Sequence, residues 1–175
     1  MRRVWVVGNS GSGKTTLARA LASKLGAPHV ELDSIYHQSG WTALPDDEFR
    51  SRIAEIVAGD TWVVDGNYYS RLGQASLGRA DTVVWIDFPR SVVMRQLFRR
   101  TLWRGLMRKE LWNGNRESLK NLLRRDPEKS ILRWAWTQHS AYKARYDEAI
   151  TGGAWDKLTV VRLRSPAEVR DFLAS

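Results

Sequence analysis

A glycine-rich stretch near the N-terminus has the residue types and spacing of a phosphate-binding site. Residues 8–15 read Gly-Asn-Ser-Gly-Ser-Gly-Lys-Thr and match the pattern G-x-x-x-x-G-K-[ST]. In such a loop, backbone N–H groups surround phosphate oxygens, a lysine reaches the β- and γ-phosphates, and a hydroxyl binds Mg²⁺. The sequence therefore predicts that Lys14 acts on the transferred phosphate and that Thr15 is a magnesium ligand.

The segments on either side of this stretch are those that a phosphate-binding loop requires. Residues 4–7 form an apolar run typical of a buried strand. Apolar residues then recur at helical spacing from Leu17 to Leu25, and Gly26 is a natural end for that helix. We expect the nucleotide phosphates to be bound by Gly8, Asn9, Ser10, Gly11, Ser12, Gly13, Lys14, Thr15 and Thr16.

Three aspartates stand at the ends of predicted strands. Asp33 ends a strand predicted over 29–33, and it could accept the proton of an attacking hydroxyl or cap the following segment. Asp65 and Asp87 end strands predicted over 61–66 and 82–87, and either could support Mg²⁺. The carboxyl ends of parallel strands form the edge where such sheets bind ligands.

The remaining pattern predicts a single α/β domain. A fifth strand is predicted over 158–163, and helices are predicted over 45–59, from about 91, over 127–150 and over 166–173. Strands that are continuously apolar and alternate with helices favour a parallel sheet covered on both faces. We therefore expect the 175 residues to form a three-layer α/β/α domain around a five-stranded parallel sheet.

The charge of the chain is uneven. Its net charge is +9, and residues 90–146 carry 15 Lys and Arg against 4 Asp and Glu, whereas the rest carries 13 against 15. Such a segment favours a polyanionic ligand. The sequence has no cysteine, no secretory signal and no membrane-spanning apolar run, so we expect a cytoplasmic protein without membrane contact.

The arginines after residue 90 divide between two faces of a predicted helix. At about 100° per residue, Arg100, Arg104 and Arg108 share one face, while Arg95 and Arg99 share another. The two faces could serve two parts of a nucleotide, or form a solvated basic surface. Arg116, Arg124 and Arg125 could join them from the segment that follows.

Aromatic and polar residues in two loops are candidates for binding the second substrate. They are Tyr36, His37, Trp41, Asn67 and Tyr68. Such side chains stack on rings and donate hydrogen bonds. Packing beneath the loop is the alternative for Trp41, and we expect most of the nine tryptophans to lie in the core.

These motifs resemble the adenylate-kinase-like P-loop kinases, and most closely the small bacterial proteins labelled adenylate kinase or "DNA topology modulation protein". The resemblance is carried by residues 8–16, 31–33, 64–68, 80–90 and 95–100. It implies a nucleoside-monophosphate-kinase-like fold with a substrate-binding insert at about 34–60 and a lid at about 104–126. Residues 34–37 and 67–69 depart from adenylate kinases where AMP would bind.

The resemblance also implies roles for particular residues. Asp65 followed by Gly66 matches the pair that holds a Mg²⁺-bound water, so we favour Asp65 over Asp87 as the magnesium residue. Arg95, Arg99 and Arg100 match arginines that clamp the transferring phosphate. The turn containing Arg164 resembles a loop that flanks the adenine, which implies ATP rather than GTP.

Two functions follow from these observations. The first is an ATP- and Mg²⁺-dependent phosphotransferase acting on a nucleotide or a small hydroxylated acceptor, with Lys14, Asp33, Arg99, Arg100 and Arg104 as catalytic residues. The alternative is an ATP-binding protein associated with nucleic acid. That alternative rests on the basic segment and its four tryptophans, Trp103, Trp112, Trp134 and Trp136.

Overall fold

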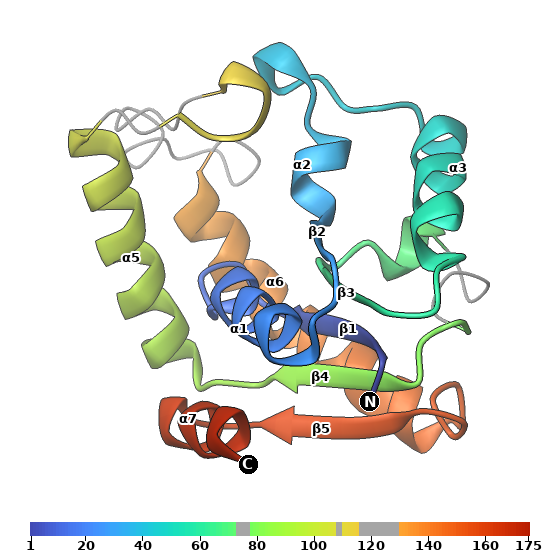
Figure 1. Ribbon diagram of the computed structural model, residues 1–175. Helices are drawn as coiled ribbons and strands as arrows, with labels where there is room; N and C mark the ends of the chain where they lie inside the picture. Colours follow the sequence, from blue (N-terminus) through green and yellow to red (C-terminus); the bar gives the residue numbers. More distant parts are fainter. Residues whose placement is uncertain (73–77, 108–109, 116–129) are drawn as a thin grey trace.

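A five-stranded parallel sheet is the centre of the molecule (Figure 1). The computed structural model describes residues 1–72, 78–107, 110–115 and 130–175. The strands are β1 (Arg3–Gly8), β2 (His29–Glu31), β3 (Trp62–Asp65), β4 (Thr82–Ile86) and β5 (Thr159–Leu163). Their order in the sheet is β2-β3-β1-β4-β5, and every pair is parallel.

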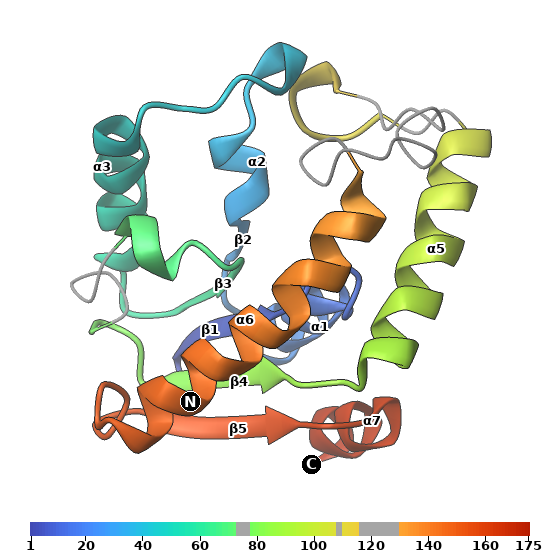
Figure 2. The ribbon, with the colours of Figure 1, turned by 180° about the vertical axis from the view of Figure 1, so that it is seen from behind.

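The described helices cover both faces of this sheet, as Figures 1 and 2 show from opposite sides. They are α1 (Lys14–Leu25), α2 (Leu32–Tyr36), α3 (Asp46–Val57), α5 (Arg90–Leu106), α6 (Ile131–Thr151) and α7 (Pro166–Ala174), with 3₁₀ turns η1 (Ser39–Trp41) and η2 (Trp112–Gly114). The predicted three-layer α/β/α fold is confirmed.

Alternating side chains of the strands enter two separate cores. Val4 and Val6 of β1 pack with α1 residues such as Leu17, on the face that α7 also covers. Trp5 and Val7 pack on the opposite face with residues of α3 and α6. Both faces of a central parallel strand are thus buried, which explains the continuous apolar runs in the sequence.

The tryptophans are less buried than the sequence suggested. Trp5, Trp62, Trp85 and Trp155 are at most 2% exposed, whereas Trp41, Trp103, Trp134 and Trp136 are 38–53% exposed. The buried set lies on the sheet or against it, and the exposed set lies on η1, α5 and α6. The helical spacing of apolar residues did not show which face of α5 and which face of α6 is buried.

The second predicted strand is shorter than expected, which corrects the position of Asp33. The strand ends at Glu31, the residue that pairs with Asp65 at the end of β3. Because β2 pairs with β3 and β3 stops there, the ladder offers Leu32 no partner, and the chain turns into α2. Ser34 Oγ donates to Glu31 O at 2.6 Å. Asp33 therefore lies in the first turn of a helix, and Glu31 stands at the sheet edge.

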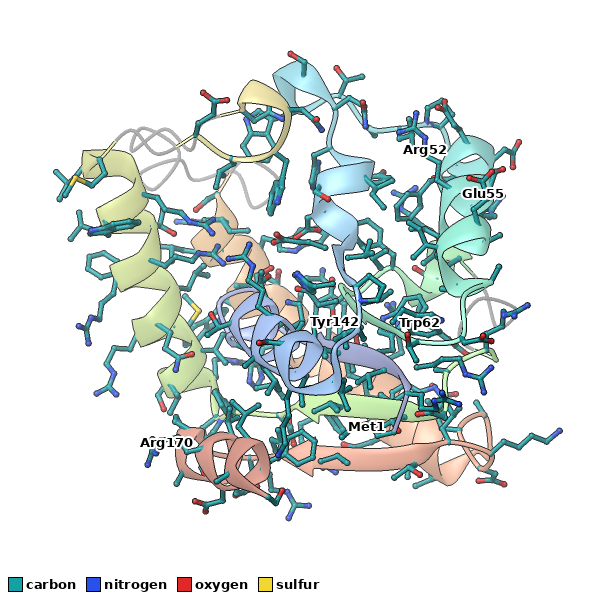
Figure 3. The ribbon with its side chains drawn as sticks, viewed as in Figure 1. Met1, Arg52, Glu55, Trp62, Tyr142 and Arg170 are labelled. Carbon is teal, nitrogen blue, oxygen red and sulfur yellow. The ribbon has the colours of Figure 1, made fainter. Side chains whose placement is uncertain are left out.

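The substrate-binding insert and the lid stay predictions. The insert at 34–60 contains most of α2, η1 and α3, where an irregular start was expected. Arg52 and Glu55 project outward from α3, and Trp62 lies beneath it (Figure 3). The lid at 104–126 begins on α5 and includes η2, but residues 108–109 and 116–129 lie outside the described residues, as do Arg108, Arg116, Arg124 and Arg125. The same holds for the predicted helix start at 127.

Helix α5 packs directly against the glycine-rich loop. A Cβ built on Gly11 would lie 2.6 Å from Leu97 Cβ, and Gly11 has a φ of +83°. No L side chain fits that approach without displacement, so the glycine sets how closely α5 lies to the loop.

Replacing Gly11 by alanine is expected to destabilise the protein through both strain and this clash. Gly26→Ala is the matched control, because Gly26 also has positive φ (+60°) but no heavy atom within 4 Å of an added Cβ. We expect the free energy of unfolding to fall by about 1 kcal/mol in the control. In Gly11→Ala it should fall by a further ~1–3 kcal/mol. Urea unfolding measures the free energy of unfolding of each variant. Equal losses in the two variants would contradict the close packing of Gly11 against Leu97.

Candidate active site

The glycine-rich loop connects β1 to α1 at the carboxyl edge of the sheet, as predicted. The N–H of Ser12 donates to Asn9 O at 3.1 Å and closes the loop, and Lys14 begins α1. Lys14 Nζ donates to the same carbonyl at 3.1 Å, so the lysine lies across the loop. Asn9 Nδ2 donates to Ala135 O of α6 at 2.8 Å, which fixes the loop against that helix.

Several charged side chains act on the ammonium group of Lys14. Burial lowers the pKa of its ammonium group, and the nearby carboxylates of Asp33, Asp65 and Glu31 act in the opposite direction. The guanidinium of Arg100 adds to the lowering. These influences indicate that the loop lysine, three carboxylates and one arginine of α5 lie in one region, although they come from four separate segments of the chain.

The groups around Thr15 fit a magnesium ion. Thr15 Oγ1 lies 2.8 Å from Asp65 Oδ2 and 3.0 Å from Glu31 Oε1. Hydroxyl and carboxylate oxygens are the ligands that Mg²⁺ prefers, and it usually keeps several waters and phosphate oxygens as further ligands. Among the described residues, no group of three or more His, Cys, Asp or Glu is placed to hold a metal.

Two members of this site were not singled out from the sequence. Glu31 and Asp65 both lie within hydrogen-bonding distance of the Thr15 hydroxyl. The sequence predicted that the strand ends at Asp33, so Glu31 was not expected at the edge of the sheet. His29 Nε2 lies 2.7 Å from Asp65 Oδ1 and holds the carboxylate, which is 2% exposed, from the side opposite Thr15. Their spacing along β2, with His29 and Glu31 on one face, was the available signal.

The Asp33 carboxylate is held by a tyrosine. Tyr68 donates its hydroxyl to Asp33 Oδ1 at 2.7 Å. Burial and then the Asp33 carboxylate raise the pKa of Tyr68, so the phenol keeps its proton and remains a donor at neutral pH. The Tyr68 ring packs with Tyr36 at 4.9 Å and Phe49 at 5.1 Å between centroids, which anchors it in the insert.

Asn67 has a different place from the one expected of an acceptor-binding residue. Its Oδ1 accepts from Gly8 N at 3.1 Å, and its Nδ2 donates to Gly8 O at 2.6 Å. Oδ1 also accepts from Tyr146 Oη at 3.0 Å. The side-chain amide therefore holds the start of the loop, rather than facing a second substrate.

The arginines are not all gathered at the site. Arg100 and Arg104 are half-buried on the inner face of α5, whereas Arg95 and Arg99 are exposed on the outer side. Arg164 is exposed after β5, where its N–H donates to Glu168 Oε2. The predicted division into two faces holds for the described arginines, and among these Arg100 is the one that contributes to lowering the pKa of Lys14.

Asp87 has a structural role in this arrangement. Arg162 of β5 forms an ion pair with it at 2.6 Å, and Lys143 of α6 lies 3.6 Å away. The Arg162 guanidinium also stacks over Trp85, 4.0 Å from the ring centroid. Asp87 thus connects β4, β5 and α6, which supports the choice of Asp65 for magnesium.

Sequence comparison finds similarity to nucleotide-binding proteins in the N-terminal half of the chain. The family described as "ATPase family associated with various cellular activities (AAA)" matches residues 4–87. A shikimate kinase of Symbiobacterium thermophilum is 33% identical over 96 residues, which cover 47% of this chain. The match spans 55% of that protein, so it covers about half of each.

Structural comparison extends the similarity to nearly the whole chain. Shikimate kinases from Bacteroides thetaiotaomicron and Acinetobacter baumannii, the latter in complex with shikimate, both superpose with a TM-score of 0.56. The Bacteroides protein is 14% identical, and the alignment covers 99% of this chain and 94% of that protein. The Acinetobacter protein is 17% identical, and the alignment covers 99% of this chain and 89% of that protein. A gluconokinase from Sinorhizobium meliloti has a TM-score of 0.50 at 20% identity, covering 99% and 91%.

The fold is therefore that of the P-loop kinases. ATP with Mg²⁺ is the cofactor pair of that class, and the loop at residues 8–15 and the oxygens around Thr15 fit both. The comparisons did not confirm the adenylate-kinase-like specificity or the "DNA topology modulation" label. No helix in the described ranges combines the length and the apolarity needed to cross a membrane.

Asp65→Asn is expected to lower the affinity for the Mg²⁺ that supports nucleotide binding. The amide keeps the shape but removes the charge beside Thr15, so we expect the Mg²⁺ concentration for half-maximal binding to rise about 10- to 100-fold. Titration with a fluorescent ATP analogue measures it. Asp87→Asn is the matched control, a strand-end aspartate at the Arg162 ion pair, and should leave that concentration unchanged. The reverse result would assign the magnesium role to Asp87.

Proposed function

We propose that this chain is an ATP-dependent kinase that transfers the γ-phosphoryl group to a hydroxyl group of a small, hydroxylated acceptor. The observation that carries the proposal is the Asp33 carboxylate, oriented by Tyr68 and close enough to influence Lys14. A carboxylate so placed can accept the proton of an attacking hydroxyl beside the phosphate-binding loop.

The comparisons support the same class of acceptor. Shikimate kinase and gluconokinase are named for hydroxylated acids rather than for nucleotides. These names favour a small hydroxylated acceptor over the nucleotide that the adenylate-kinase resemblance implied, and they lend no support to the nucleic-acid alternative. The identity of the acceptor is the open part of the proposal.

Each residue then has one task in the reaction. The loop N–H groups and Lys14 hold the β- and γ-phosphates, and Lys14 stays beside the phosphoryl group as charge develops on it. Asp33 Oδ2 accepts the hydroxyl proton while Tyr68 keeps Oδ1 fixed. Arg100 adds positive charge on the side of α5, and Thr15, Asp65 and Glu31 would hold the cation. Mg²⁺, when bound, neutralises phosphate charge.

Asp33→Asn tests the proposed base. ADP release with Mg²⁺-ATP is measured against a panel of hydroxylated acids, polyols, nucleosides and nucleoside monophosphates. With the acceptor so found, we expect kcat to fall about 10²- to 10⁴-fold. Lys14→Ala should lose at least about 100-fold. Asp47→Asn on α3, whose carboxylate is 99% exposed, is the control and should match wild type. An Asp33→Asn enzyme within a few-fold of wild type would refute the proton-acceptor role.

Tyr68→Phe tests how Asp33 is oriented. Loss of one hydrogen bond to a carboxylate should lower kcat/KM for the acceptor about tenfold or more, while the affinity for ATP stays within twofold. Tyr69→Phe, at the neighbouring half-buried tyrosine, is the matched control. A fall in ATP affinity equal to the fall in kcat/KM would show that the Tyr68 hydroxyl supports the loop instead.

A further inference from the structure

Two tight turns from distant parts of the chain meet above the candidate site. One is η1, in which Gly40 and Trp41 have φ of +70° and +62°. The other is η2, in which Asn113 and Gly114 have φ of +55° and +78°. Figures 1 and 2 both show the two turns side by side. Trp41 and Asn113 are the two non-glycine residues with positive φ among the described residues.

The left-handed Trp41 is held by a side chain 74 residues away. Its N–H donates to Asn115 Oδ1 at 2.9 Å, and Asn115 Nδ2 donates to Gln38 O at 2.8 Å. Asn115 is 4% exposed, and its amide thus satisfies main-chain groups on both sides of η1. Positive φ is rare for a bulky aromatic residue, and such strain persists only where surrounding contacts impose it.

The turn η2 also contacts the end of α2, the helix that carries Asp33. Asn113 Nδ2 donates to His37 O at 2.6 Å and to Ser34 O at 3.2 Å, two carbonyls at the end of α2. The His37 ring stacks on Trp112, with 6.0 Å between centroids and 19° between planes. Helix α2 has five residues, too few to be stable by itself, so these contacts decide where it lies.

We propose that Asn115, together with Asn113, is a positioning residue for Asp33. The two amides clamp α2 and η1 to the segment that follows α5. This inference rests on the proposed kinase activity only for its kinetic test.

Hydrogen exchange tests the clamp without any acceptor. Asn115→Ala removes both bonds to η1, and Asn113→Gly removes the amide while allowing the left-handed backbone. In both variants we expect at least about tenfold faster exchange in residues 32–44, with the central sheet unchanged. Ser39→Ala, at an exposed position of the same turn, is the control. Unchanged exchange in residues 32–44 would overturn the clamp, whether or not the protein proves to be a kinase.

A double-mutant cycle then separates positioning from general support. Asn115→Ala should lower kcat/KM for the acceptor about 10- to 100-fold while the dissociation constant for ATP stays within twofold. In an Asp33→Asn background the same substitution should have little further effect, because it acts through Asp33. A full multiplicative effect in that background, or an equal loss of ATP affinity, would overturn the positioning role.

Discussion

The paired hydrogen bonds between the Asn67 amide and the Gly8 backbone fix the geometry on which the site depends. They join the first residue of the phosphate-binding loop to the residue that follows β3 and Gly66. Trp5 Nε1 donates to Gly66 O at 3.0 Å and reinforces the same junction from β1. With the loop and the end of β3 held together, Asp65 lies beside Thr15.

Charges of both signs meet at the site: Lys14 and Arg100 lie near the carboxylates of Asp33, Asp65 and Glu31. Burial disfavours the charged form of Lys14, and Arg100 disfavours it further. Three nearby carboxylates compensate for this, and bound nucleotide phosphates would add negative charge to the same region. A ligand that binds the folded state and not the unfolded chain raises the free energy of unfolding by mass action.

Around Asp33, aromatic packing contributes more to the structure than regular secondary structure does. Tyr36, Phe49 and Tyr68 contact one another, and His37, Trp41 and Trp112 continue the cluster up to the meeting of η1 and η2. Five-residue α2 depends on these contacts and on the amides of η2. The helix that carries Asp33 is therefore held by side chains that are far from it in sequence.

The sequence by itself determined the phosphate-binding loop, the parallel α/β fold and the candidacy of Asp33 and Asp65, because these depend on local pattern and spacing. Tertiary structure alone decided that β2 ends at Glu31, since strand length there depends on where β3 stops. It also decided that Asn67 holds the loop, that Asp87 pairs with Arg162, and that Arg100 rather than Arg99 faces Lys14. Each of these outcomes depends on which distant group comes within hydrogen-bonding or electrostatic range, and a linear pattern does not contain that information.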